Sequence, residues 1–207
     1  MFFVLEGIDG SGKTTQADRV ERWLKGALGG DAVLRTREPG GWEGAERARQ
    51  FVLDGGLVSP WSEFFFFMLD RCEHVERVIK PALSAGKIVL SDRYAPSTFA
   101  YQIFANPAVP PESADYLERL PEVIGLPAPD AVFLLDVDAR TAAARLFSRG
   151  AKDGFDGRGG RYFEMVRDGY ERVGRRAKNW IKIDASGSED DVFAGLASRI
   201  TGLLELN

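Results

Sequence analysis

The 207-residue chain has little of the chemistry that disulfide-bonded folds and several enzyme classes require. Cys72 is the only cysteine and His74 the only histidine, which excludes an internal disulfide, a thiolate-rich zinc site and a multi-histidine metal centre. The net charge of −4 gives no overall basic field for nucleic acid or an anionic membrane. The longest apolar stretches, such as residues 64–69, are far shorter than the ~20 residues of a membrane span, and the first residues lack a secretion-signal pattern. We therefore expect a cytoplasmic protein without nucleic-acid or membrane partners.

The remaining composition predicts a single domain over residues 1–207. Hydrophobic residues make up 44% and charged residues 28% of the chain, a balance typical of globular proteins. Continuous apolar runs predict strands buried on both faces of a parallel sheet, at residues 2–5, 32–34, 88–90, 131–135 and 180–183. Helical patterns alternate with them, at residues 14–25, 43–53, 60–84, 111–123, 140–149, 161–178 and 189–204. This alternation predicts a doubly wound α/β fold.

Residues 7–14, with the sequence GIDGSGKT, match the phosphate-loop spacing G-x-x-x-x-G-K-[ST] between a predicted strand and a predicted helix. Glycines in such a loop let backbone N–H groups surround phosphate oxygens, and the helix start adds partial positive charge. We expect Lys13 to hold the outer phosphates of a nucleotide and Thr14 to bind Mg²⁺. A glycine turn with this spacing by chance is the alternative.

Two further segments end at the same predicted edge of the sheet. Asp92 follows the strand at 87–91, where a carboxylate can face the phosphate loop and bind Mg²⁺, and Arg93 could bridge the phosphates of two substrates. An ion pair between Asp92 and its own neighbour Arg93 is the alternative. Residues 37–41 (REPGG) form a predicted sharp turn from which Arg37 projects into the cleft.

Together these motifs resemble the thymidylate kinase family, nucleoside monophosphate kinases that transfer phosphate from ATP to dTMP. The resemblance is carried by the phosphate loop, by residues 37–41, 92–94 and 101–102, and by residues 183–185, so it spans essentially the whole chain. It implies a P-loop NTPase fold, with a five-stranded parallel sheet flanked by helices and a short lid at about residues 149–161. It also implies ATP as co-substrate, Mg²⁺ as cofactor, dTMP as acceptor and a homodimer.

The resemblance assigns site residues as well. The ATP phosphates are expected at Gly7, Asp9, Gly10, Ser11, Gly12, Lys13, Thr14 and Thr15, and Mg²⁺ at Thr14 and Asp92. The dTMP site is expected at Asp9, Arg37, Arg49, Phe67, Arg71, Arg93, Ser97, Thr98, Tyr101 and Gln102.

Within that dTMP site, Phe67 is expected to stack on thymine, and Arg71, four residues later on the same helix face, to bond a thymine carbonyl. Phe64, Phe65 and Phe66 are expected in the core or in subunit contacts, and core packing is the alternative for Phe67 too. Gln102 matches a base contact, Asp9 a contact of the 3′-hydroxyl and Arg49 a residue near the acceptor phosphate. Tyr101 matches a ring that crowds the 2′ side of the sugar, with core packing as its alternative.

The predicted lid departs from the family pattern. Family members without an arginine in the phosphate loop commonly carry one in the lid, but here residues 153–156 read DGFD, with Gly154 in the arginine position. Arg149, Arg158 and Arg161 lie nearby and can substitute, which gives an expected catalytic set of Lys13, Asp9, Arg93, Arg149 and Arg158. The altered lid leaves two alternatives open: a kinase for another deoxynucleotide or a deoxynucleoside, or a nucleotide-binding sensor with weak transfer activity.

Two residues remain without an assigned function. His74 is interpreted as a helix-surface or packing histidine with no catalytic role. Trp42 follows the glycine pair at 40–41, where small hydroxyl residues are common in the family, and the sequence offers no reason for it.

Overall fold

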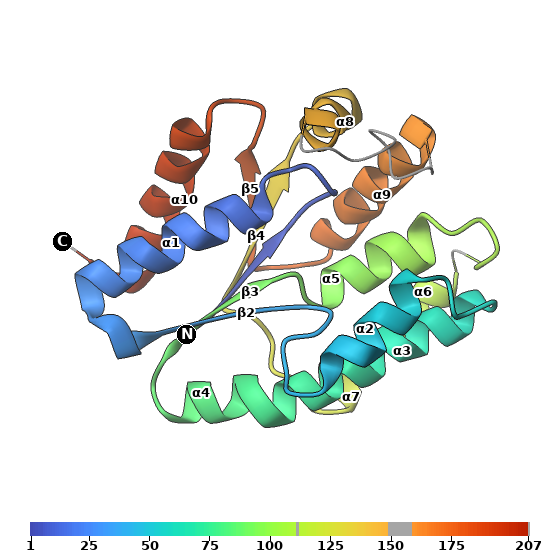
Figure 1. Ribbon diagram of the computed structural model, residues 1–207, viewed down its shortest axis with the longest axis horizontal. Helices are drawn as coiled ribbons and strands as arrows, with labels where there is room; N and C mark the ends of the chain where they lie inside the picture. Colours follow the sequence, from blue (N-terminus) through green and yellow to red (C-terminus); the bar gives the residue numbers. More distant parts are fainter. Residues whose placement is uncertain (111, 149–158, 207) are drawn as a thin grey trace.

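The computed structural model describes residues 1–110, 112–148 and 159–206. Its sheet has five parallel strands in the order β2-β3-β1-β4-β5 (Figure 1). The strands are β1 (Phe2–Glu6), β2 (Val33–Arg37), β3 (Ile88–Asp92), β4 (Ala131–Asp136) and β5 (Trp180–Asp184). This arrangement confirms the predicted doubly wound α/β fold.

Helices cover both faces of the sheet, as Figure 1 shows. They are α1 (Lys13–Leu28), η1 (Gly30–Ala32), α2 (Ala45–Leu53), α3 (Pro60–His74), η2 (Val75–Ile79), α4 (Lys80–Ser84), α5 (Ala95–Thr98), η3 (Phe99–Phe104), α6 (Ser113–Leu117), α7 (Leu120–Val123), α8 (Ala139–Ser148), α9 (Gly159–Gly174) and α10 (Glu189–Leu204). Side chains of β1 alternate between the two layers: Phe3 and Leu5 join a core with α1, α9 and α10, while Phe2 and Val4 join a second core that η2 and α4 cover. Burial on both faces explains why β1 is continuously apolar until Glu6.

Several predicted helices differ in detail. The helix predicted at 60–84 is continuous but contains one π-helical segment, η2, between α3 and α4, and it ends before Gly86, whose φ of +74° favours glycine. In place of the helix predicted at 111–123 there are two short helices, α6 and α7, and Pro121 lies in the first turn of the second. The helix predicted at 43–53 begins at Ala45, because Gly44 adopts a φ of +91°.

Residues 95–104 form α5 and the π-helical η3, although the helical patterns given above do not include this segment. Pro96 is tolerated there because it lies in the first turn, where no helical N–H bond is required. Packing stabilises this segment: Gly169 of α9 lies so close to Ala100 that a Cβ on the glycine would be 3.0 Å from the Ala100 carbonyl oxygen.

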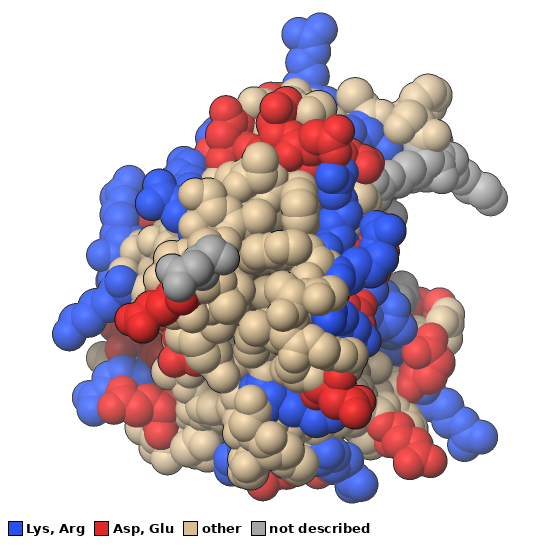
Figure 2. Space-filling view, turned by 90° about the vertical axis from the view of Figure 1, so that its left-hand side faces the viewer, with Lys and Arg blue, Asp and Glu red and all other residues tan. Residues whose placement is uncertain are grey.

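Figure 2 shows the charged side chains on one side of the molecule. Basic and acidic side chains are interspersed there around a central area without charged residues. Within residues 1–110, 112–148 and 159–206, no helix is long and apolar enough to cross a bilayer.

Candidate active site

The phosphate loop connects β1 to α1 at the carboxyl edge of the sheet, next to the ends of β2 and β3. Gly7, Gly10 and Gly12 have φ values of +147°, +84° and +92°, which L side chains rarely adopt. A Cβ on Gly10 would also overlap the carbonyl oxygen of Ala142 in α8. The glycine spacing is therefore a geometric requirement of this loop.

The Lys13 side chain is buried against the phosphate loop. Its Nζ donates to the carbonyl oxygens of Gly7 and Ile8, each at 2.9 Å, and lies 3.4 Å from Ser11 Oγ. Burial and then the nearby Arg93 guanidinium lower the pKa of Lys13 to about 8, although Asp9 and other acidic groups oppose that shift. The ammonium group is thus in place for phosphate oxygens but less basic than a surface lysine.

The two residues predicted to bind Mg²⁺ are brought together. Thr14 Oγ1 donates to Asp92 Oδ2 at 2.9 Å, so a hydroxyl and a carboxylate meet beside the phosphate loop. Oxygen ligands of this kind, supplemented by phosphate and water, are those that Mg²⁺ prefers. The donor set therefore fits the predicted cation.

Arg93 is held by several acceptors and has a φ of +74°, a conformation that is strained for a residue with a side chain. Its Nη2 lies 2.5 Å from Asp9 Oδ1, and its Nη1 donates to Gly7 O at 3.1 Å and Ser97 Oγ at 2.9 Å. Among the described residues its ion pair is therefore with Asp9, and not with Asp92 as the alternative interpretation held. Although burial opposes it, the charges of Arg93 and Lys13 lower the pKa of Asp9.

A cavity of about 560 Å³ extends from the phosphate loop to α3. Its wall includes fifteen of the predicted site residues: Asp9, Gly10, Gly12, Lys13, Thr14, Arg37, Arg49, Phe67, Arg71, Asp92, Arg93, Ser97, Thr98, Tyr101 and Gln102. Gly7, Ser11 and Thr15 belong to the loop and the start of α1 but not to the cavity wall. Arg149 and Arg158 lie outside the described residues. The volume is within the usual range for small-molecule sites.

Phe67 and Arg71 face the same cavity from α3, as their spacing predicts. The Arg71 guanidinium is fixed by Glu38 Oε2, which accepts from Nε at 2.8 Å, and by Thr98 Oγ1, which accepts from Nη2 at 2.9 Å. A guanidinium has five N–H groups, so Arg71 can still donate to a carbonyl oxygen in the cavity. Gln102 lines the same cavity from η3, and its Nε2 is 3.5 Å from Oε1 of Glu63 in α3.

The phenylalanine run is divided among different surroundings. Phe64 is fully buried in a core cluster, as expected, and Phe66 is partly buried. Phe65 is 56% exposed, so it does not pack in the core of this chain. Tyr101 packs against the main core and also lines the cavity; its place beside the 2′ position of a sugar stays a prediction.

His74 is completely buried, so its interpretation as a helix-surface residue is wrong and the packing interpretation holds. Its Nδ1 is 2.9 Å from Glu38 Oε1 and its Nε2 is 2.6 Å from Thr36 Oγ1. The histidine thus joins α3 to the end of β2 and fixes the carboxylate that in turn fixes Arg71.

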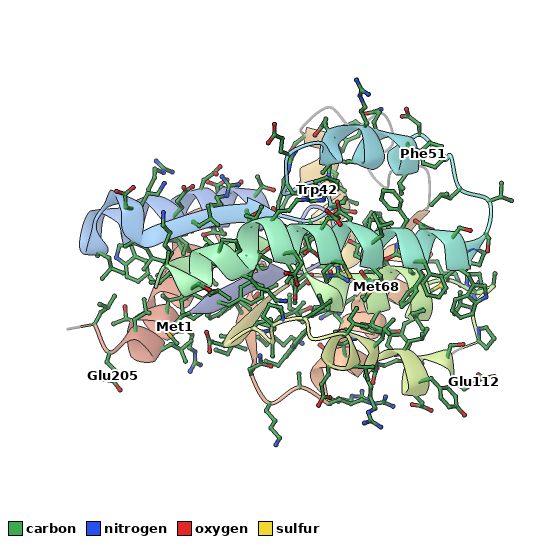
Figure 3. The ribbon with its side chains drawn as sticks, turned by 90° about the horizontal axis from the view of Figure 1, so that it is seen from below. Met1, Trp42, Phe51, Met68, Glu112 and Glu205 are labelled. Carbon is green, nitrogen blue, oxygen red and sulfur yellow. The ribbon has the colours of Figure 1, made fainter. Side chains whose placement is uncertain are left out.

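Trp42 also has a structural explanation. Its indole Nε1 donates to Asp70 Oδ1 at 2.9 Å, and the backbone N–H of Gly40 donates to the other oxygen of that carboxylate at 3.2 Å. Figure 3 shows Trp42 between the turn after β2 and helix α3. Burial raises the pKa of Asp70, which these donors partly offset.

Sequence reasoning missed Glu6 and Tyr170, which lie beneath the site. Glu6 is fully buried; its Oε1 accepts from the backbone N–H groups of Tyr94 and Ser97, and its Oε2 from Ser97 Oγ and Tyr170 Oη. Burial raises the pKa of Glu6, against the opposing effect of Arg93. A charged residue at the end of an otherwise apolar strand was the signal available for Glu6, whereas nothing in the sequence distinguishes Tyr170 from other helix residues.

Comparisons with known proteins support the family resemblance over nearly the whole chain. The family model described as thymidylate kinase matches residues 5–195. The thymidylate kinase of Leifsonia xyli is 38% identical over 204 residues, covering 98% of this chain and 95% of the relative. That of Mesoplasma florum is 38% identical over 212 aligned residues, covering 100% and 97%.

A solved structure supports the same assignment. The crystal structure of thymidylate kinase from Ehrlichia chaffeensis superposes with a TM-score of 0.77 at 29% identity and covers 98% of each chain. This likeness and the five-stranded parallel sheet confirm the predicted P-loop kinase fold. By sequence and by structure, the chain belongs to the thymidylate kinase family.

Proposed function

We propose that this protein transfers the γ-phosphate of ATP to dTMP, giving ADP and dTDP. The observation that carries the proposal is a single cavity that joins the phosphate loop to the pocket of Phe67 and Arg71, with Arg93 in its wall. A reaction between two nucleotides requires their phosphates to meet in one enclosed space. The family assignment favours this activity over the two alternatives that the altered lid suggested.

The donor end of the cavity has the groups that a triphosphate requires. Backbone N–H groups of the phosphate loop and of the first turn of α1 are available for phosphate oxygens, and Lys13 would add a positive charge. Thr14 and Asp92 would hold Mg²⁺, which when bound neutralises charge on the phosphates. Arg93 adds a second positive charge between donor and acceptor.

The acceptor end explains a preference for thymine. Phe67 offers an aromatic face for stacking, and Arg71 offers N–H groups to the O4 carbonyl, where cytosine has an amino group that cannot accept. A site built to bond one such group discriminates strongly against bases that lack it. We assign the 2′ side of the sugar to Tyr101, whose ring disfavours a ribose hydroxyl sterically.

Phosphoryl transfer requires alignment and charge neutralisation rather than a side-chain nucleophile. In the described part of the chain Lys13 and Arg93 supply positive charge, and Asp9 helps to align the reactants by holding the Arg93 guanidinium. We further propose that Arg149 or Arg158 supplies the lid cation. In other phosphoryl-transfer systems such an arginine contributes ~10³–10⁵ in rate.

Two assembly properties belong to the proposal. Phe65 and Leu69 lie on one face of α3 and are 56% and 57% exposed, which supports a homodimer through that helix. Sedimentation at micromolar concentration should give twice the mass of one chain, and Leu69→Glu should shift it to the monomer. A single domain over residues 1–207 and a cytoplasmic location are part of the same proposal.

The proposal is tested with a panel of dTMP, dUMP, dCMP and dGMP, with ATP and Mg²⁺, in a coupled ADP assay. The wild type should have its highest kcat/KM with dTMP, and Lys13→Met should abolish turnover. Lys25→Met, in the last turn of the same helix α1, is the matched control and should retain it. A higher kcat/KM with another monophosphate would refute dTMP as the substrate, and nucleotide binding with negligible turnover would favour the sensor alternative.

A further inference from the structure

Tyr170 lies in helix α9, and its hydroxyl group meets four other segments of the fold. The Tyr170 oxygen is 2.8 Å from Glu6 Oε2, 2.9 Å from Ser97 Oγ, 3.0 Å from Arg93 Nη1 and 3.3 Å from Gly7 O. These partners belong to β1, α5, the segment after β3 and the phosphate loop. The tyrosine is 1% exposed and does not line the cavity, so it contacts no substrate there.

The hydrogen-bond roles of this hydroxyl are fixed by its neighbours. Arg93 can only donate, so the Tyr170 oxygen accepts from Nη1, and its own proton can go to Glu6 Oε2, Ser97 Oγ or Gly7 O. Burial and then the Glu6 carboxylate raise the pKa of Tyr170 well above its ordinary value, so the phenol keeps that proton. Tyr170 Oη therefore bonds both Arg93 and Glu6, as Ser97 Oγ also does, and the two hydroxyl groups lie between the guanidinium and the carboxylate.

These hydrogen bonds influence the direction in which the Arg93 guanidinium points. Glu6 and Asp9 are acidic groups that face Arg93, and only Asp9 lines the cavity. With the hydroxyl in place, Nη2 lies 2.5 Å from Asp9 Oδ1 at the phosphate loop. Nη1 is shared among Tyr170 Oη, Ser97 Oγ and Gly7 O. Loss of the Tyr170 hydroxyl leaves Ser97 alone between Arg93 and the buried Glu6 carboxylate, so we expect the guanidinium to shift toward Glu6 and away from the phosphate loop.

The position of the hydroxyl is itself set by packing. Gly169, its neighbour in α9, lies against the backbone of Ala100, and the ring of Tyr170 meets that of Tyr101 edge-on with centroids 6.2 Å apart. Helix α9 begins directly after residues 149–158. The Tyr170 hydroxyl therefore links the position of α9 to the position of the Arg93 guanidinium.

We propose that Tyr170 is a positioning residue for phosphoryl transfer, which holds the Arg93 guanidinium over the phosphate loop by standing between it and Glu6. The inference rests on the proposed kinase function. It assigns Tyr170 an effect on the reaction that a residue filling space in the core would not have.

Tyr170→Phe removes only the oxygen and tests this directly. We expect kcat to fall about tenfold or more, the loss expected for one hydrogen bond to a charged group, while both KM values change less than about threefold. Tyr116→Phe, the same change at an 82% exposed tyrosine of α6, should leave kcat and KM unchanged. In an Arg93→Lys background the Tyr170→Phe change should have little further effect on kcat, because both act through one group.

A ligand-free measurement separates this inference from the proposed function. In protein with ¹⁵N-labelled arginine, the Arg93 guanidinium, assigned from Arg93→Lys, should give resolved Nη signals in the wild type and in Tyr116→Phe. Tyr170→Phe should broaden or merge them. Glu6→Gln removes the competing charge at conserved volume, so the Tyr170→Phe/Glu6→Gln double variant should recover kcat and the resolved Nη signals, and it replaces Tyr170→Phe as the test if that single variant is too unstable to assay. A double variant with both still lost would contradict the positioning role.

The outcomes are distinct. A wild type that phosphorylates no monophosphate refutes the proposed function but leaves the guanidinium measurement as the test of Tyr170. Unchanged Arg93 signals, an unchanged kcat in Tyr170→Phe, or additive effects in the Arg93→Lys/Tyr170→Phe double variant would overturn the positioning role, even where the melting temperature falls.

Discussion

The lowered pKa of Lys13 predicts that ATP affinity weakens as the pH rises from 7 to 9. The pKa is about 8 in the ligand-free protein, chiefly because the ammonium is buried and then because Arg93 lies nearby. Phosphate oxygens stabilise the charged form, so ATP should bind the protonated lysine preferentially. Binding above pH 8 therefore includes uptake of a proton.

The size of the effect follows from that pKa. If only the protonated form binds, the apparent Kd rises about tenfold between pH 7 and pH 9, because roughly one molecule in ten retains the proton at pH 9. Phosphate groups, with a second pKa of about 6, are already largely ionised over this range and contribute little. Lys13→Arg should bind ATP with an affinity nearly independent of pH, since arginine stays charged.

Isothermal titration calorimetry at pH 8.5, in buffers with different ionisation enthalpies, measures the proton uptake directly. We expect roughly 0.7 protons per ATP in the wild type and near zero in Lys13→Arg. An ATP affinity that stays constant from pH 7 to pH 9, or equal proton uptake in both proteins, would show that Lys13 is not the titrating group.

The same pKa predicts a trend in stability. Because the folded-state pKa is below the ordinary value of 10.5, the unfolded chain binds more protons between about pH 8 and 10.5. Lys13 should therefore make the ligand-free protein more stable as pH rises through that window, by at most about 3 kcal/mol. Urea unfolding of the wild type and Lys13→Met across this range measures the difference in slope.

Three further changes test other parts of the structure. Gly10→Ala should weaken ATP binding more than about tenfold, because the added Cβ would overlap Ala142. Gly26→Ala in α1 is the control: a Cβ there meets no atom within 4 Å, so ATP binding should be unchanged and the free energy of unfolding should rise by up to ~1 kcal/mol. His74→Ala should lower the free energy of unfolding by about 3 kcal/mol in urea titrations, since it leaves buried partners unsatisfied; a change below ~1 kcal/mol would contradict the buried network. Ser188→Ala removes the capping box of α10 and should lower the melting temperature by about 3 °C without affecting kcat, and no shift would contradict the cap.

Much of the site could be predicted because its residues serve local geometry or close sequence spacing. The glycines of the phosphate loop adopt positive φ values that the motif itself encodes, and Phe67 and Arg71 share a face because they are four residues apart. Thr14 and Asp92 could be paired because parallel strands end at one edge of the sheet. These relations depend on residue spacing and on the order of elements along the chain, and both can be read from the amino-acid sequence.

The sequence alone determined the five strands, most of the helices and the phosphate loop, because hydrophobic periodicity and glycine spacing act over a few residues. The family resemblance added most of the residues that line the cavity. Only the tertiary structure decided how buried polar groups are paired. His74 with Glu38, Asp70 with Trp42, and Tyr170 with Glu6 join residues 28 to 164 positions apart. Burial forces each such group to find a partner, but its identity depends on how helices pack across the sheet, which no local pattern specifies.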